Sequence, residues 1–304
     1  MRIFRHDDCL AHVTPPGHPE QVDRLRAIER KLQGIEVERT DCPMGHEDDI
    51  LRCHPQTYID RLRRAVPSQG WTQVDGDTFL SPGSWNAAMR AVGGITAAVD
   101  HVIERGDRAF VAARPPGHHA ERETAMGFCL FGTAAIGAMR ALEVHGLTRV
   151  AVLDFDVHHG NGTQDLLWDE PRIRFVSSHQ MPLYPGSGYP SERGAHGQIT
   201  NLPLRSGSAG AEMRAAWQPV LDDLARWEPE LVMVSAGFDA HRDDPLAGLN
   251  WRTEDFAWIT RAICDLAEKT SGGRVVSTLE GGYDLDALAD SVAAHVNELN
   301  GSAK

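Results

Sequence analysis

Short apolar segments alternate with longer segments of helical pattern along the chain. Five apolar segments are rich in Val, Ile, Leu or Phe, which is typical of strands buried on both faces of a parallel sheet. They cover residues 109–113, 150–157, 173–177, 231–235 and 275–279. The segments that predict helices cover residues 85–105, 132–145, 211–227 and 253–270. This alternation predicts an α/β fold with a mostly parallel central sheet and helices on both faces.

The 304 residues contain no internal repeat, low-complexity block or long Ser/Gly linker that would mark a boundary between domains. We therefore expect one domain that spans residues 1–304. In a sheet of this kind, ligands bind beyond the carboxyl ends of the strands. The polar residues that directly follow the apolar segments are accordingly the first place to look for chemistry.

The first polar cluster is a pair of adjacent histidines, His118 and His119, on a turn that two prolines and a glycine make rigid. A single histidine is more often a structural residue. A pair at the ligand-binding end of a sheet favours acid–base catalysis or metal binding.

The second cluster consists of Asp154, Asp156 and His158, which are spaced two residues apart at the end of segment 150–157. In an extended strand, these three side chains point to the same side. Three ionisable groups on one face of a buried strand are costly unless they bind a cation. Two carboxylates and an imidazole therefore predict part of a metal site.

The third cluster follows segment 231–235 and contains four further candidates for a metal ligand. They are Asp239, His241, Asp243 and Asp244. The spacing does not choose among them. One more ligand would complete a three-ligand site with a position free for water, which is the pattern of catalytic zinc sites.

The fourth cluster is Tyr283, which follows two glycines after segment 275–279. It is a weak signal by itself, because a packed tyrosine beside a Gly-Gly turn is common.

The motifs that are typical of serine hydrolases, of nucleoside triphosphatases and of dinucleotide-binding enzymes are absent from the sequence. The chain has no G-x-S-x-G elbow, no phosphate-binding G-x-x-x-x-G-K-[ST] loop and no G-x-G-x-x-G fingerprint.

Composition and charge narrow the function further. A net charge of −13 argues against a nucleic-acid-binding surface and suits the attraction of cationic substrates. No apolar run approaches the roughly 20 residues of a membrane span, and the first residues lack the apolar core of a secretory signal. The five cysteines are scattered, without a C-x-x-C pair. We therefore expect a cytoplasmic protein with reduced thiols and with no nucleic-acid or membrane partner.

Taken together, the four clusters resemble the histone deacetylase superfamily, which includes bacterial acetylpolyamine amidohydrolases and deacetylase-like amidohydrolases. The matching segments are RPPGHHAERETAMGFC, LDFDVHHGNGTQ, VSSH, LYPGSG, AGFDAHRDDPLAGL and LEGGY, in the family's order over residues 114–283. Two further segments, PPGHPE at 15–20 and GDTFLSPGSW at 76–85, extend the similarity toward the N-terminus. The resemblance implies an arginase-like α/β fold and a bacterial, class II-like deacetylase.

The resemblance also implies the cofactors. It makes Asp156, His158 and Asp244 the ligands of one Zn²⁺ per chain, because the family's third ligand is the Asp directly before a proline. It further implies a structural K⁺ near the zinc. The residues implied for this potassium site are Asp154, Asp156, His158, Ser177 and Ser178.

The same comparison implies catalytic and substrate-binding residues. His118 and His119 match the tandem catalytic histidines, and Tyr283 matches the tyrosine that binds the substrate carbonyl. Asp154 matches the carboxylate behind the first histidine. The positions that match the rim and walls of an acyl-lysine tunnel are Asp77, Gly127, Phe128 and Tyr184.

The residue that matches the partner of the second histidine is Asn161, whereas class I members of the family carry an Asp. Class II-like members share the Asn. A neutral amide orients an imidazole but does not stabilise its cation as a carboxylate does. We hypothesise that Asn161 leaves His119 free to act as a base near neutral pH.

We expect a zinc-dependent amidohydrolase that removes acetyl or other acyl groups from acylated amines such as Nε-acyl-lysine. An acetylpolyamine amidohydrolase is the alternative. A non-catalytic acyl-lysine-binding module would not need the ligands, the histidines and the tyrosine together, and a ureohydrolase would need a second metal ion. Trp251 either narrows the tunnel mouth or packs in the following helix. The sequence is compatible with a homo-oligomer.

Overall fold

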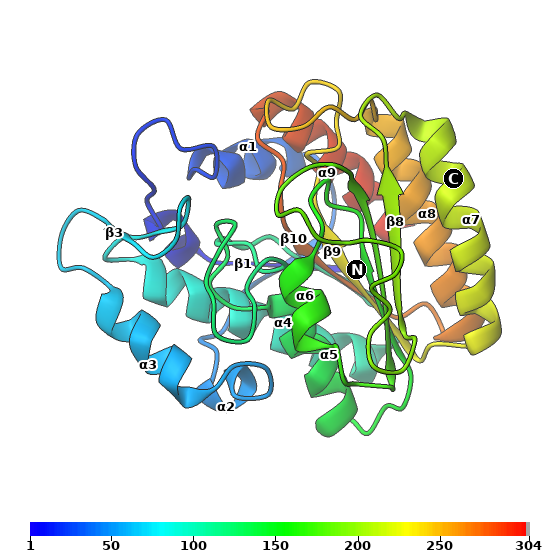
Figure 1. Cartoon of the computed structure of the whole chain (residues 1–304), viewed down its shortest axis with the longest axis horizontal. Coiled ribbons are helices and arrows are strands. Elements are labelled where there is room, and N and C mark those ends of the chain that lie inside the picture. Colours follow the sequence, from blue (N-terminus) through cyan, green and yellow to red (C-terminus); the bar gives the residue numbers. More distant parts are fainter. Residues whose placement is uncertain (302–304) are drawn as a thin grey trace.

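A single sheet of eight parallel strands forms the centre of the molecule. The computed structural model describes residues 1–301, and its strands follow the order β2-β1-β5-β10-β9-β6-β7-β8 (Figure 1). The strands of this sheet are β1 (Arg2–Arg5), β2 (Glu38–Asp41), β5 (Arg108–Val111), β6 (Val150–Asp154), β7 (Ile173–Gln180), β8 (Ile199–Leu204), β9 (Leu231–Ala236) and β10 (Val275–Leu279). A separate antiparallel pair consists of β3 (Thr72–Gln73) and β4 (Phe79–Leu80).

Helices cover both faces of the sheet (Figure 1). On one face α1, α9, α8 and α7 pack in a row, and on the other α4 packs against α5. The bounds are η1 (Asp7–Ala11, a 3-10 helix), α1 (Asp23–Leu32), α2 (Glu47–Ile50), α3 (Gln56–Ala65), α4 (Ser84–Arg105), α5 (Thr133–Glu143), α6 (Asn161–Leu166), α7 (Gly210–Trp227), α8 (Thr253–Thr270) and α9 (Leu285–Leu299). Within residues 1–301, no helix has both the length and the apolar character to cross a membrane.

The predicted α/β fold with a parallel sheet is confirmed. The five predicted strands correspond to β5, β6, β7, β9 and β10, and the four predicted helices correspond to α4, α5, α7 and α8. The strands without a prediction lie toward the edges of the sheet. One of the two edge strands, β2, has the sequence ERTD and no buried residue, so it lacks the apolar signal of a buried strand.

The strand order explains how the four clusters meet. β5, β10, β9 and β6 are consecutive neighbours in the middle of the sheet. All four are parallel, so their carboxyl ends lie at the same edge. The segments that follow these strands are the four polar clusters of the sequence, and the fold therefore gathers them at one place.

Candidate active site

The segment after β6 turns sharply and brings its ionisable groups together. Asp154 Oδ1 accepts the N–H of Asp156 at 3.0 Å, and Asp156 Oδ1 accepts the N–H of His158 at 2.9 Å. The strand ends at Asp154, so the expected extended strand to residue 157 is wrong. The physical reason is that carboxylates bonded to the backbone two residues ahead compete with the pairing of a sheet.

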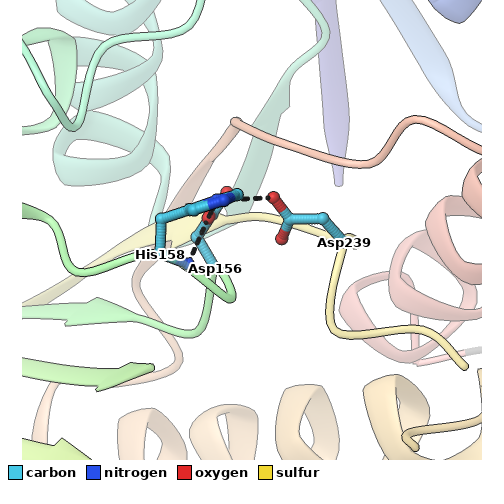
Figure 2. A group of neighbouring side chains, drawn as sticks. All are labelled: Asp156, His158 and Asp239. Atoms are coloured by element: carbon cyan, nitrogen blue, oxygen red, sulfur yellow. Dashed lines mark hydrogen bonds and ion pairs between the residues drawn. The ribbon is translucent and has the colours of Figure 1, made fainter. Parts of the chain in front are cut away.

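A candidate metal-binding cluster lies at this turn. Ligand atoms of Asp156, His158 and Asp239 all lie within 4.8 Å of one another (Figure 2). His158 Nδ1 is 3.1 Å from Asp156 Oδ1 and 3.1 Å from Asp239 Oδ2. All three side chains are buried, and among residues 1–301 only histidines form ion pairs with the two carboxylates. A buried imidazole between two carboxylates is a donor set that suits a divalent cation.

Asp244, which the family resemblance implies as the third ligand, lies beside this cluster. Its Oδ2 accepts the N–H of Tyr283 at 2.7 Å, and its Oδ1 accepts the N–H of Leu246 at 2.9 Å. Burial and then the charge of Asp239 raise the pKa of Asp244 to about 7. The two acids differ in position. Asp239 has no exposed surface and contacts His158. Asp244 accepts hydrogen bonds from Tyr283 and Leu246, which both line a pocket.

His118 and His119 lie side by side after β5, with ring centroids 4.0 Å apart. His118 Nδ1 is 3.0 Å from Asp154 Oδ2, and His119 Nδ1 is 2.7 Å from Asn161 Oδ1. Burial opposes a charge on His118, but the charges of Asp156 and Asp154 outweigh it and raise the pKa of His118 well above its ordinary value. Burial and then the charge of His118 lower the pKa of His119 well below its ordinary value. His118 is therefore the cation of the pair at neutral pH, and His119 is the neutral imidazole.

The loop after β10 carries Tyr283 to the same place. Arg24, from α1, holds this loop by donating to the carbonyl oxygens of Gly282 at 2.7 Å and Glu280 at 2.5 Å. The guanidinium carbon of Arg24 lies 5.1 Å from the centroid of the Tyr283 ring. Burial raises the pKa of Tyr283 well above its ordinary value, so its hydroxyl keeps its proton and can donate it in a hydrogen bond.

A pocket of about 590 Å³ leads to these groups, and His119, His158 and Tyr283 line it. Aromatic rings form part of its wall: the ring centroid of Phe128 lies 5.8 Å from that of Tyr283, and that of Tyr184 lies 5.2 Å from that of His119. The lining contains all four residues expected at the rim and walls of a tunnel: Asp77, Gly127, Phe128 and Tyr184. Two histidines and a phenol thus line the same pocket.

Comparisons with known proteins agree with this arrangement. The family model described as the histone deacetylase domain matches residues 18–299. The chain belongs to this family. It is 42% identical to an uncharacterized protein of Synechocystis sp., over 98% of this chain and 99% of that protein. It is 36% identical to the histone deacetylase-like amidohydrolase of Pseudomonas aeruginosa, over 95% of this chain and 79% of that protein.

A solved structure, the HD domain of HDA15, superposes on the chain with a TM-score of 0.93 and 29% sequence identity. The match covers 99% of this chain and 90% of the other. The arginase-like α/β fold that the resemblance implied is therefore confirmed, as is membership of the histone deacetylase family.

Trp251, which was expected either at the tunnel mouth or packed in the following helix, is buried. It is only 1% exposed and packs against Phe256 of α8, so packing, rather than narrowing of the entrance, is its role.

The two serines expected at a potassium site lie on β7, beside the end of β6. Ser177 lies opposite Asp154 in the register of β6 with β7. The hydroxyl of the neighbouring Ser178 is buried and has no hydrogen-bond partner within the described residues.

Sequence reasoning missed a buried ionic cluster beneath the pocket. Glu20 forms ion pairs with Arg114, at 2.6 Å between Oε2 and Nη2, and with Arg24, at 3.1 Å between Oε1 and Nη1. All three side chains have no exposed surface. The signals were two motifs of the family pattern: PPGHPE, which ends at Glu20, and RPPGHHAERETAMGFC, which begins with Arg114. The cluster connects the loop before α1 to the turn that carries the two histidines.

Proposed function

We propose that this histone deacetylase family member is a zinc-dependent amidohydrolase that removes acetyl or other acyl groups from Nε-acyl-lysine. One observation carries the proposal: a buried cluster of acids with an imidazole, a histidine pair and a protonated tyrosine each contribute a residue to the lining of one pocket, namely His158, His119 and Tyr283. A binding module would need only the pocket. The additional groups are those that amide hydrolysis requires.

Zn²⁺ fits the residues at the end of the pocket. We infer that Asp156, His158 and Asp244 hold it, because Asp244 accepts hydrogen bonds from two residues that line the pocket, whereas Asp239 is fully buried and accepts the N–H of Val157 between the other two ligands. Burial and then the charge of Asp156 raise the pKa of Asp239, and burial and then the charge of Asp239 raise the pKa of Asp244, so the buried acids repel one another and a divalent cation would relieve this repulsion. When bound there, zinc would polarise the amide carbonyl and lower the pKa of a water molecule.

Residues of the chain carry out the proton transfers and stabilise the charge that develops. Asn161 engages His119 Nδ1, so Nε2 is the atom that accepts the proton of the attacking water and later gives it to the leaving amine. His118, paired with Asp154, remains a cation and stabilises negative charge in the transition state. The hydroxyl of Tyr283 donates to the carbonyl oxygen as charge develops on it.

A structural K⁺ near this site belongs to the same proposal. The residues are Asp154 at the end of β6, Asp156 and His158 of the turn after it, and Ser177 and Ser178 of β7. The support is the buried, unpartnered hydroxyl of Ser178 and the adjacency of β6 and β7. An oxygen-rich group of this kind suits a hard cation.

The shape and charge of the pocket support an acylated amine as the substrate. Its aromatic walls, Phe128 and Tyr184, suit the alkyl chain of lysine, and Asp77 lies among the lining residues for contact with the rest of the substrate. An acetylpolyamine is the second candidate, because no Lys or Arg of the described residues lines the pocket to repel a second ammonium group.

The test is a rate comparison of the purified protein on acetyl-lysine peptides, longer acyl-lysine peptides and acetylpolyamines. We expect hydrolysis of acyl-lysine at the highest kcat/KM and about one zinc per chain by elemental analysis. Dialysis against a chelator should remove both the zinc and the activity, and added Zn²⁺ should restore them. A zinc-loaded protein that cleaves none of these amides, or a content of two manganese ions, contradicts the proposal.

A further inference from the structure

A carboxylate lies directly behind Asn161, the partner of His119. Asn161 Nδ2 donates to Glu121 Oε1 at 2.7 Å, while its Oδ1 is 2.7 Å from His119 Nδ1. Asn161 is only 6% exposed and is the first residue of α6. Glu121 follows His119 by two residues and is partly buried, and its N–H donates to the carbonyl oxygen of Thr124 at 3.0 Å. The three side chains form a continuous chain of hydrogen bonds.

The carboxylate of Glu121 fixes the direction of these hydrogen bonds. An ionised carboxylate only accepts hydrogen bonds, so the NH₂ group of Asn161 must face Glu121. The carbonyl oxygen of Asn161 must then face His119, and an oxygen acceptor requires that Nδ1 carry the hydrogen. The neutral ring consequently has its lone pair on Nε2. That is the atom proposed above to take the proton of the water.

We propose that Glu121 is a positioning residue that sets the tautomer of His119 through the amide of Asn161. This inference rests on the proposed amidohydrolase function. It also changes the interpretation of the Asn at this position. The sequence suggested that His119 has a neutral partner in place of a carboxylate, whereas the fold supplies the carboxylate one residue further away.

The first experiment removes the acceptor. In Glu121→Gln the side chain can present either its oxygen or its NH₂ group, so the amide of Asn161 loses its fixed direction. We expect kcat for an acetyl-lysine peptide to fall about tenfold or more with KM within about twofold, as is usual for partners behind a catalytic group. Glu123→Gln is the matched control: it removes the same charge two residues further on, from an exposed side chain, and should leave kcat unchanged.

The second experiment exchanges the two groups. Asn161→Asp alone places two carboxylates in contact and should also lower kcat. The double variant Glu121→Gln with Asn161→Asp places an acceptor against His119 and a donor behind it, so kcat should return to within about threefold of the native value. A purely structural role for Glu121 predicts no such rescue. Single variants with native kcat, or a double variant no better than the worse single variant, would overturn the inference.

The third experiment needs no substrate. Long-range ¹H–¹⁵N spectra of protein labelled in histidine show which ring nitrogen carries the hydrogen, and a His119→Gln sample assigns the signal. We expect His119 to carry it on Nδ1 in the native protein and in the double variant, and to show a mixture in Glu121→Gln. An Nε2–H tautomer in the native protein would refute the inference. If the native protein cleaves no acylated amine, the proposed function fails, and these spectra still decide the role of Glu121.

Discussion

At the scale of single residues, the phenol of Tyr283 is the simplest test of the proposed chemistry. Its hydroxyl is protonated and lines the pocket beside His119 and His158. Tyr283→Phe removes one donor to the developing oxyanion and keeps the ring. We expect kcat to fall on the order of 10²-fold, as the loss of one such donor usually causes, with a smaller change in KM. Steady-state kinetics on an acetyl-lysine peptide measures both.

Tyr189→Phe is the control, because Tyr189 is 54% exposed and does not line the pocket. It should retain the native kcat. If Tyr283→Phe keeps a rate within about threefold of the native value, the phenol takes no part in the reaction and the oxyanion must be held by other groups.

The second prediction at this scale separates Asp244 from Asp239. If Asp244 is a ligand, Asp244→Ala should purify without stoichiometric zinc, because two protein ligands remain. Asp239→Asn should still bind zinc, with affinity about 10–100-fold lower, since Asp239 supports the first two ligands by accepting the N–H of Val157 and by contacting His158. Asp243→Ala, whose native side chain is 59% exposed, is the matched control for the loop. Elemental analysis and competition with a chelator measure the affinities. The opposite pattern would assign the third ligand to Asp239.

At the scale of elements, helix α4 approaches another segment so closely that a side chain is excluded. A Cβ built on Gly93 would overlap the carbonyl oxygen of Pro43, and Gly45 donates its N–H to Met89 of the same helix at 2.8 Å. Gly93→Ala improves helix propensity by about 1 kcal/mol, but it must separate two backbones. We expect a net loss of about 1–3 kcal/mol in the free energy of unfolding.

Denaturant unfolding of Gly93→Ala against Gly34→Ala measures this effect. Gly34 has no heavy atom within 4 Å of a built Cβ, so its substitution should change the free energy of unfolding little. Equal stability of the two variants would show that α4 can move away from the segment around Pro43 at no cost.

At the scale of the whole molecule, buried neutral histidines make stability depend on pH. His295 has 1% exposure and bridges Thr260 and Ser277, with N–O distances of 2.7 and 2.8 Å. Burial lowers the pKa of His295 to about 3. The unfolded chain takes up this proton near pH 6.5, whereas the folded protein does not. His295 therefore contributes stability above pH 6.5 that is lost as the pH falls toward 3.

His295→Gln removes this titration while it keeps a polar side chain between the two hydroxyls. Between pH 7 and pH 5, the free energy of unfolding of the native protein should fall by about 2 kcal/mol more than that of the variant. Urea unfolding at both pH values gives the difference directly, so that the titration of other groups cancels. Parallel pH profiles for the two proteins would mean that His295 has the same pKa in the folded and in the unfolded chain.

Much of the site follows from local sequence alone. The spacing of two between Asp154, Asp156 and His158 predicted that their side chains gather at one place, although the structure gathers them by a turn and not by an extended strand. The apolar segments also predicted the central strands, because a strand buried on both faces must be apolar throughout. The types of residue and their spacing are sufficient for both conclusions.

Contacts between distant segments required the tertiary structure. Spacing left four candidates for the third ligand, and the fold separates Asp239, which contacts His158, from Asp244, which holds the loop of Tyr283. The contact of Glu121 with Asn161 was not predicted either. The two residues are 40 positions apart, and no sequence pattern at that distance predicts a hydrogen bond. The sequence by itself determined which chemical groups each strand end carries. The order of the parallel strands decided which of them meet, because that order alone sets the distances between segments that lie far apart in the chain.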